Sequence, residues 1–112
     1  MIARVWHGWT TPDNADRYET LLKTEIFPGI LAKNVAGFRH IELFRRDRPA
    51  EGGGEDEVEF VTVMWFDSLG AVEAFAGADY ATAYVPAAAR QVLKRFDARS
   101  AHYEVRAQVD AA

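Results

Sequence analysis

One histidine near the N-terminus is the side chain best placed for acid–base chemistry. His7 lies within MIARVWHGW, which reads as a strand of alternating faces. A neutral imidazole at pH 7 can take a proton from a phenol, so His7 is the candidate catalytic base. The alternative is a structural histidine, because a histidine on an apolar strand face usually hydrogen-bonds within the protein.

Aromatic residues are the second group with possible chemistry. A box of aromatic side chains suits a flat, apolar ligand that carries one or two polar groups. A tryptophan at a strand end or a phenylalanine in a helix stripe can equally belong to the hydrophobic core. The candidate ligand-binding residues are Trp9, Trp65, Phe75, Tyr80, Tyr84, His102 and Tyr103.

Composition excludes several classes of function. The chain has 13 basic and 17 acidic residues and a net charge of -4, the wrong sign for binding a phosphate backbone, so no nucleic-acid partner is expected. It has no cysteine and no HExxH spacing, so we expect no metal site and no cofactor.

Length and hydrophobicity predict one domain. The 112 residues are 49% hydrophobic, enough for a single core. We assign residues 1–107 to that domain and 108–112 to a polar tail. No stretch resembles a signal peptide or reaches transmembrane length, so we expect a cytoplasmic protein without a membrane partner.

Apolar periodicity and turn residues predict the elements. The clearest part is a β-branched and aromatic run over 58–66, followed by the helix cap Ser68 and the exit residue Gly77. Thr11 caps an earlier helix, which Pro28 is expected to end. The predicted strands are 2–9, 37–46, 58–66 and 99–107, and the predicted helical segments are 12–27, 69–76, 79–84 and 86–96.

This order is that of the ferredoxin-like βαββαβ unit, an α+β sandwich with helices on one face of an antiparallel sheet. We expect the spatial strand order fourth, first, third, second. With the first and third strands taken as parallel, His7, Trp65 and Tyr103 meet at one end of the sheet.

Alternation along the strands assigns each residue to the helices or to the open face. The residues assigned to the helices are Ala3, Val5, Ile41, Leu43, Val61, Val63 and Trp65. Those assigned to the open face are Ile2, Arg4, Trp6, Phe38, Glu42, Phe44, Phe60, Met64, Phe66 and His102. Because monomers rarely expose apolar patches beyond roughly 300–600 Å², we expect a homodimer through this sheet face.

The chain from residue 2 to about 105 resembles the antibiotic biosynthesis monooxygenase-like branch of the dimeric α/β barrel proteins, in a bacterial subgroup. The resemblance is carried by WHGWTTPDNADRYETLL, VTVMWFDSLGAVEAFAG and SAHYEV. It implies a ferredoxin-like fold, a dimeric α/β barrel and a pocket between the sheet and the helices. It implies function less directly, because relatives include cofactor-independent quinone-forming monooxygenases and haem-degrading enzymes.

The haem-degrading branch matches this chain at none of its catalytic positions. Its strand-one Asn falls on Trp6 or His7, its helix-two Trp on Phe75, and the His ten residues later on Val85. We therefore expect no haem degradation.

The quinone-forming branch matches at Trp65 alone. Its Asn falls on Val61, its Tyr near Val72 and its Arg near Pro86. Three readings follow: a cofactor-independent monooxygenase or related enzyme acting on a small phenol- or quinol-type compound, a non-catalytic binding protein for a small aromatic compound, or a structural homodimer.

Overall fold

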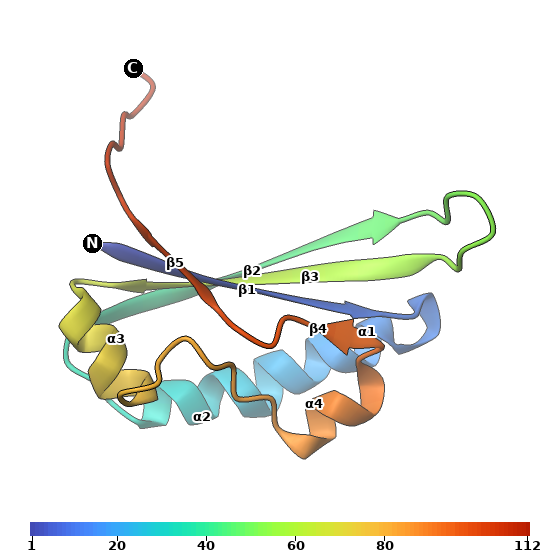
Figure 1. The fold of residues 1–112 in the computed structure, drawn as a ribbon, viewed down its shortest axis with the longest axis horizontal. Helices are drawn as coiled ribbons and strands as arrows, with labels where there is room; N and C mark the ends of the chain where they lie inside the picture. Colours follow the sequence, from blue (N-terminus) through green and yellow to red (C-terminus); the bar gives the residue numbers. More distant parts are fainter.

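The computed structural model describes residues 1–112 as one sheet with every helix on the same side of it (Figure 1). The strands are β1 (Ile2–Thr10), β2 (Phe38–Arg48), β3 (Glu57–Phe66), β4 (Arg95–Phe96) and β5 (Ala101–Glu104). The helices are α1 (Pro12–Leu21), the π-helix η1 (Leu22–Ile26), α2 (Phe27–Ala32), α3 (Leu69–Ala76) and α4 (Ala87–Val92). The predicted ferredoxin-like α+β class is confirmed, and β4 is an additional short strand.

The sheet has the predicted strand order. Its neighbours run β2-β3-β1-β4, and β5 also pairs with β1. Every pair is antiparallel, including β1 with β3. The expectation that the first and third strands are parallel is therefore wrong. The helical crossover makes β1 and β2 parallel, and the hairpin makes β3 antiparallel to β2, so β3 must also run against β1.

The first helical region begins as predicted and continues further. Thr11 caps α1, since its side chain accepts a hydrogen bond from the Asn14 amide. Pro28 does not end the helix. The π-helical turn bonds the Phe27 amide back to the Leu22 carbonyl, and Pro28 then falls in the first turn of α2, where no amide hydrogen is needed.

The second helix has the predicted ends. Ser68 accepts a hydrogen bond from the Ala71 amide at the start of α3. Gly77 follows the helix with φ 87°, a conformation that L-residues with a side chain rarely adopt. No helix in the chain has both the length and the apolar character needed to cross a bilayer.

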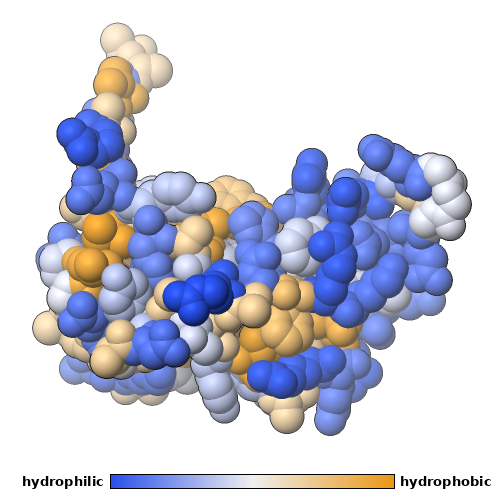
Figure 2. Space-filling model, viewed as in Figure 1, coloured by the Kyte–Doolittle hydropathy of each residue, from blue (hydrophilic) through white to orange (hydrophobic).

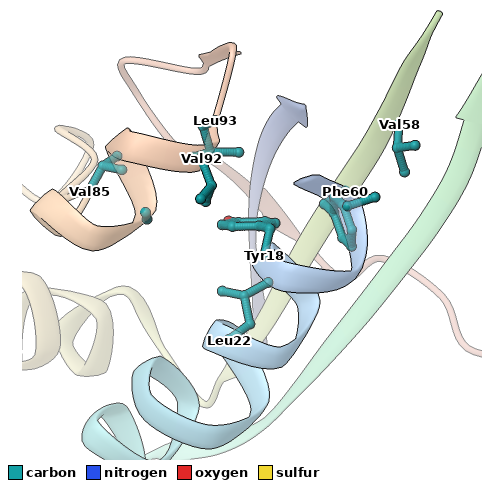
Figure 3. Close-up of a cluster of buried hydrophobic side chains, with 9 residues drawn as sticks. Tyr18, Leu22, Val58, Phe60, Val85, Val92 and Leu93 are labelled. Carbon is teal, nitrogen blue, oxygen red and sulfur yellow. The ribbon is translucent and has the colours of Figure 1, made fainter. Parts of the chain in front are cut away.

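The larger hydrophobic cluster packs α1 and α4 against the sheet. Tyr18 of α1 meets Phe60 of β3 edge-on, with ring centroids 5.0 Å apart. Figure 3 shows Tyr18 between Phe60 and Val92 of α4. A smaller cluster packs α3 against β3 and consists of Met64, Phe66, Ala71 and Val72.

The structure reverses the predicted faces of β1 and β3. Phe60 and Phe66 are fully buried beneath the helices, because their large side chains fill the space that the valines of β3 would leave empty. The register fixes all other positions of the two strands. The helix side therefore carries Ile2, Arg4, Trp6, Phe60, Met64 and Phe66, and the open face carries Ala3, Val5, Val61, Val63 and Trp65.

β5 follows the same reversal. His102 lies beside Arg4, and Tyr103 lies beside Ala3. His102 is therefore on the helix side, not on the open face as predicted, and Tyr103 is on the open face. The two residues exchange places because a shift of one residue along a strand moves every side chain to the other face.

A bulge changes the face of β2 partway along. The register against β3 shifts between Phe38 and His40, so Phe38 and Ile41 both reach the core although they are three residues apart. The prediction that Phe38 lies on the open face is therefore wrong. The assignments of Ile41 and Leu43 to the helix side and of Glu42 and Phe44 to the open face are confirmed.

Candidate functional site

A cavity of about 540 Å³ lies between the sheet and the helices. Its walls come from β1 and β3 on one side and from α1, η1, α2, α3 and α4 on the other, and 15 of its 23 lining residues are hydrophobic. Figure 2 shows hydrophobic residues reaching the surface along the seam between the sheet and the helices. This volume falls within the range of about 300–1,000 Å³ that is typical of small-molecule sites.

The π-helical turn forms part of the cavity wall. Leu22, Glu25 and Ile26 of η1 all line the cavity. π-Helical turns are rare and occur often at functional sites, because the wider turn changes which side chains point inward. The π-helical turn, which directly precedes α2 and Pro28, thus contributes to the shape of the cavity.

Arg4 is the buried charge of this cavity. Its side chain lines the cavity although the residue is only 7% exposed. Nη1 donates to the carbonyl oxygen of Tyr80 at 2.5 Å and to Nε2 of His102 at 2.9 Å. Burial lowers the pKa of Arg4, and no carboxylate offsets that effect. Because an arginine in a protein stays protonated, Arg4 is a positive charge in the cavity wall that pairs with no carboxylate.

His102 is held neutral beside Arg4. A guanidinium has only donors, so Nε2 of His102 must accept the hydrogen bond, and the ring proton then resides on Nδ1. Burial lowers the pKa of His102, and the charge on Arg4 lowers it further. The ring also meets Tyr80 edge-on, with centroids 5.0 Å apart.

We expect the free energy of unfolding to decrease as the pH falls below about 6.5, the ordinary pKa of the imidazole. The unfolded chain protonates His102 near that pH, whereas the folded chain resists protonation until a lower pH. Over this window the unfolded state binds more protons, so acid favours it. Urea unfolding at a series of pH values between 8 and 5 measures the effect.

His102→Gln should reduce this pH dependence, because glutamine keeps a polar group near Arg4 but does not titrate. Equal slopes for His102→Gln and the wild type would contradict the prediction.

Tyr18 gives the cavity a phenolic hydroxyl group. Its ring belongs to the core, yet the residue also lines the cavity. The hydroxyl makes no hydrogen bond within the chain. The one side-chain nitrogen or oxygen that is both completely inaccessible and without a partner is Nε1 of Trp9, so the Tyr18 hydroxyl is not completely inaccessible. The Tyr18 hydroxyl is therefore accessible, and the cavity is where it can be reached. Burial raises the pKa of Tyr18, so the hydroxyl is a neutral donor.

Phe75 marks the positively charged end of the cavity. The guanidinium carbon of Arg4 lies 5.8 Å from the centroid of its ring, and Nζ of Lys33 lies 4.6 Å from it. Both cations line the cavity, and the one carboxylate that does so is Glu25. The cavity thus has a positive balance of charge in a chain whose net charge is -4.

Four of the predicted ligand-binding residues lie in or next to this cavity. Phe75 and Tyr84 line it, and Tyr84 lies at the exposed rim. Tyr80 and His102 adjoin it through their hydrogen bonds with Arg4. The structure therefore brings together four of the seven predicted ligand-binding residues, around an arginine that the prediction did not include.

His7 and Trp9 lie on the open face of the sheet. Nδ1 of His7 is 2.7 Å from Oδ2 of Asp97, and its ring stacks on that of Trp9 with centroids 5.8 Å apart. The guanidinium of Arg95 covers the Trp9 ring at 4.0 Å. Neither His7 nor Trp9 lines the cavity. Because the sheet separates His7 from that space, His7 cannot act as the base for a ligand bound there.

Trp65 and Tyr103 are also on the open face. Nε1 of Trp65 donates to Oε1 of Glu42 at 2.7 Å, and its ring stacks on His40. The predicted convergence of His7, Trp65 and Tyr103 at a pocket under the helices is wrong. The antiparallel pairing of β1 and β3 places His7 opposite Val61, toward the other end of β3 from Trp65.

Comparison with known proteins identifies the fold. No family model and no curated protein matches the sequence. Among solved structures, a Bacillus cereus protein provisionally assigned as an antibiotic biosynthesis monooxygenase aligns with a TM-score of 0.65 and 15% sequence identity, over 98% of this chain and 97% of that one. This chain has an antibiotic biosynthesis monooxygenase-like fold. At 15% identity the likeness concerns the fold, and function has to be argued from the site.

Within the antibiotic biosynthesis monooxygenase-like fold, the residues that sequence reasoning missed are those on the reversed faces. Arg4 and Trp6 were assigned to the open face, and Tyr18 was not among the candidate residues. One feature of the sequence indicates which face of β3 meets the core. Phe60, Met64 and Phe66 occupy alternate positions and are bulkier than the valines between them, a difference that favours the core side.

Proposed function

We propose that the protein is a cofactor-independent monooxygenase that acts on a small aromatic compound of the phenol or quinol type. The observation that supports this is the cavity of about 540 Å³, which is mostly apolar and contains few polar groups. Trp6 and Phe75 supply aromatic walls, and Arg4 and Tyr18 supply polar contacts. The likeness to a protein provisionally assigned as a monooxygenase points to the same class.

The proposed reaction balances with oxygen alone. A phenol and O₂ give a quinone and water: one oxygen atom enters the ring, the other leaves as water, and the substrate supplies the electrons. The electron-rich form of the substrate is its phenolate. A buried positive charge favours that anion, because opposite charges attract strongly where water is excluded. Arg4 is the group in the cavity that can supply this effect.

The remaining side chains of the cavity would bind and orient the substrate. The apolar walls exclude water, which strengthens the field of Arg4. The Tyr18 hydroxyl can donate to a substrate oxygen because no partner in the chain uses it. Holding the ring between fixed walls also reduces the entropy lost on the way to the transition state.

A cavity-filling variant tests this proposal. Ala76 of α3 lines the cavity, whereas Ala74 of the same helix is exposed and does not. Ala76→Trp should weaken binding of phenols and naphthols at least about tenfold, which corresponds to about 1.4 kcal/mol, and should lower oxygen uptake in parallel. Calorimetry measures the binding and an oxygen electrode measures the turnover.

Ala74→Trp is the matched control and should leave both measurements unchanged. If the two variants behave alike, the ligand does not occupy this cavity. If binding is lost in Ala76→Trp but the wild type consumes no oxygen with any phenol or quinol, the oxygenase proposal fails and the binding site remains.

A non-catalytic binding protein is the second candidate. The observation in its favour is that no histidine lines the cavity, so the side chain that most often acts as a general base is absent there. The measurement above separates the two candidates, because a binding protein gives the calorimetric signal without oxygen uptake.

We also propose that two copies of the chain pair through the open face of the sheet. No helix covers this face (Figure 1), and its apolar side chains remain partly exposed. An uncovered apolar surface of this kind favours a protein partner. The residues that would lie in this interface are Val5, Phe44, Val61, Val63, Trp65 and Tyr103.

A further inference from the structure

Arg4 has hydrogen-bonding capacity that the chain does not use. A guanidinium carries five N–H groups, and Nη1 provides the two that bond to Tyr80 and His102. Nε and Nη2 of Arg4 bond to no atom of the chain. Neither atom is completely inaccessible, because Nε1 of Trp9 is the one side-chain polar atom that is both inaccessible and without a partner. The side of the guanidinium formed by Nε and Nη2 is therefore available to a ligand in the cavity that Arg4 lines.

This free side of Arg4 has a defined preference. Nε and Nη2 present two parallel N–H groups, the arrangement that binds both oxygens of a carboxylate at once. Tyr80 and His102 fix Nη1 from the opposite side, so the fork is held in place before a ligand arrives. A phenol presents one oxygen and would not occupy both N–H groups as a carboxylate does.

The positive charge in the cavity also favours an anionic ligand. A buried charge costs folding free energy unless a partner compensates it. Arg4 has a neutral imidazole and a carbonyl oxygen as partners and no carboxylate. Lys33 adds a second positive charge near the same Phe75 ring. A ligand with an acidic group would supply the missing counter-charge.

We propose that the ligand of this cavity is an aromatic carboxylic acid, with its carboxylate held by Nε and Nη2 of Arg4 and its ring against Trp6 and Phe75. The inference shares with the proposed function only the cavity as the binding site. It adds the chemical class of the compound: an acid, hydroxylated if the protein oxidises it.

Calorimetry with matched probes tests the proposal on the unmodified protein. The probes are 2-naphthoate, the uncharged 2-naphthamide of nearly the same shape, and 2-naphthol. Hydrogen bonds to charged groups contribute about 1.5–3 kcal/mol, so naphthoate should bind about 10- to 100-fold more tightly than either neutral probe. Equal affinity for naphthoate and naphthamide would overturn the proposal while leaving the cavity as a site for neutral compounds.

Variants assign the effect to Arg4. Arg4→Met should weaken naphthoate binding about 10- to 100-fold and change naphthamide binding less than about threefold. Arg4→Lys keeps the charge but lacks the two parallel N–H groups, so its affinity for naphthoate should lie between those of the wild type and of Arg4→Met. Arg106→Met is the matched control, because Arg106 is an exposed arginine that does not line the cavity, and it should change naphthoate binding less than about threefold.

The outcomes separate this proposal from the oxygenase proposal. If naphthoate binding depends on Arg4 but hydroxynaphthoates cause no oxygen uptake, the acid site stands and the oxygenase function fails. If Arg4→Met folds by circular dichroism and binds naphthoate like the wild type, the acid site fails. Absence of binding by all three probes would overturn the acid site and the use of this cavity together.

Discussion

Phe60→Ala should lower the free energy of unfolding by about 3–5 kcal/mol. Phe60 is fully buried and meets Tyr18 edge-on in the larger hydrophobic cluster. Its removal loses the transfer free energy of the ring and leaves a void that the sheet backbone cannot close. Since small domains unfold with about 5–15 kcal/mol, the variant should be near the limit of stable folding. Urea unfolding followed by circular dichroism measures the difference.

Phe44→Ala is the matched control for the face of the sheet. Phe44 is 50% exposed on the open face, so the same substitution should cost less than about 1 kcal/mol at low protein concentration. The sequence pattern placed both phenylalanines on one face, whereas the structure places them on opposite faces. A larger loss for Phe44→Ala than for Phe60→Ala would show that the faces are assigned wrongly.

Val63→Glu should prevent the proposed pairing of two copies. Val63 lies on the open face and pairs with Val5 of β1, so a dimer through this face would bury the new carboxylate without a partner. An uncompensated buried charge costs about 3 kcal/mol or more, which raises the dissociation constant of the dimer at least about 100-fold. Light scattering with size-exclusion chromatography at micromolar concentration detects the change from dimer to monomer.

Leu31→Glu provides the control for this substitution. Leu31 is an exposed apolar residue of α2, on the helix side of the molecule, with 59% of its surface accessible. The variant should have the same mass in solution as the wild type. A wild-type protein that is monomeric at micromolar concentration, or a Val63→Glu variant that stays dimeric, would contradict pairing through the open face.

The oxygenase and binding-protein candidates share the same dependence on Arg4. A buried cation without a counter-ion lowers stability, and such groups persist where function needs them. The neutral His102 and the carbonyl oxygen of Tyr80 position the guanidinium without neutralising it. That arrangement leaves the charge to act on a ligand.

The sequence by itself determined four of the strands, the helices that begin at Pro12 and Leu69, and the order of the strands in the sheet. The predicted helical segment 79–84 is wrong, because these residues form a turn and an isolated bridge, and the predicted helix 86–96 is α4 followed by the strand β4. Thr11, Ser68 and Gly77 mark helix ends through local hydrogen bonds and backbone conformation, which need no distant contact. The strand order and the helices on one face follow from the succession of elements and the handedness of crossovers. The antiparallel direction of β3 relative to β1, which the prediction had as parallel, also follows from that topology.

Only the tertiary structure decided which face of the sheet is the core. Along β1 and β3 both faces carry apolar residues, so a period of two defines two faces without saying which one meets the helices. The choice depends on how side-chain volumes fill the space beneath α1, α3 and α4, and a bulge after Phe38 changes the pattern within β2. Arg4 and its cavity lie on the chosen face. A strand pattern cannot reveal a charged residue in a cavity, because the cavity exists only where helices far along the chain fold back over the sheet.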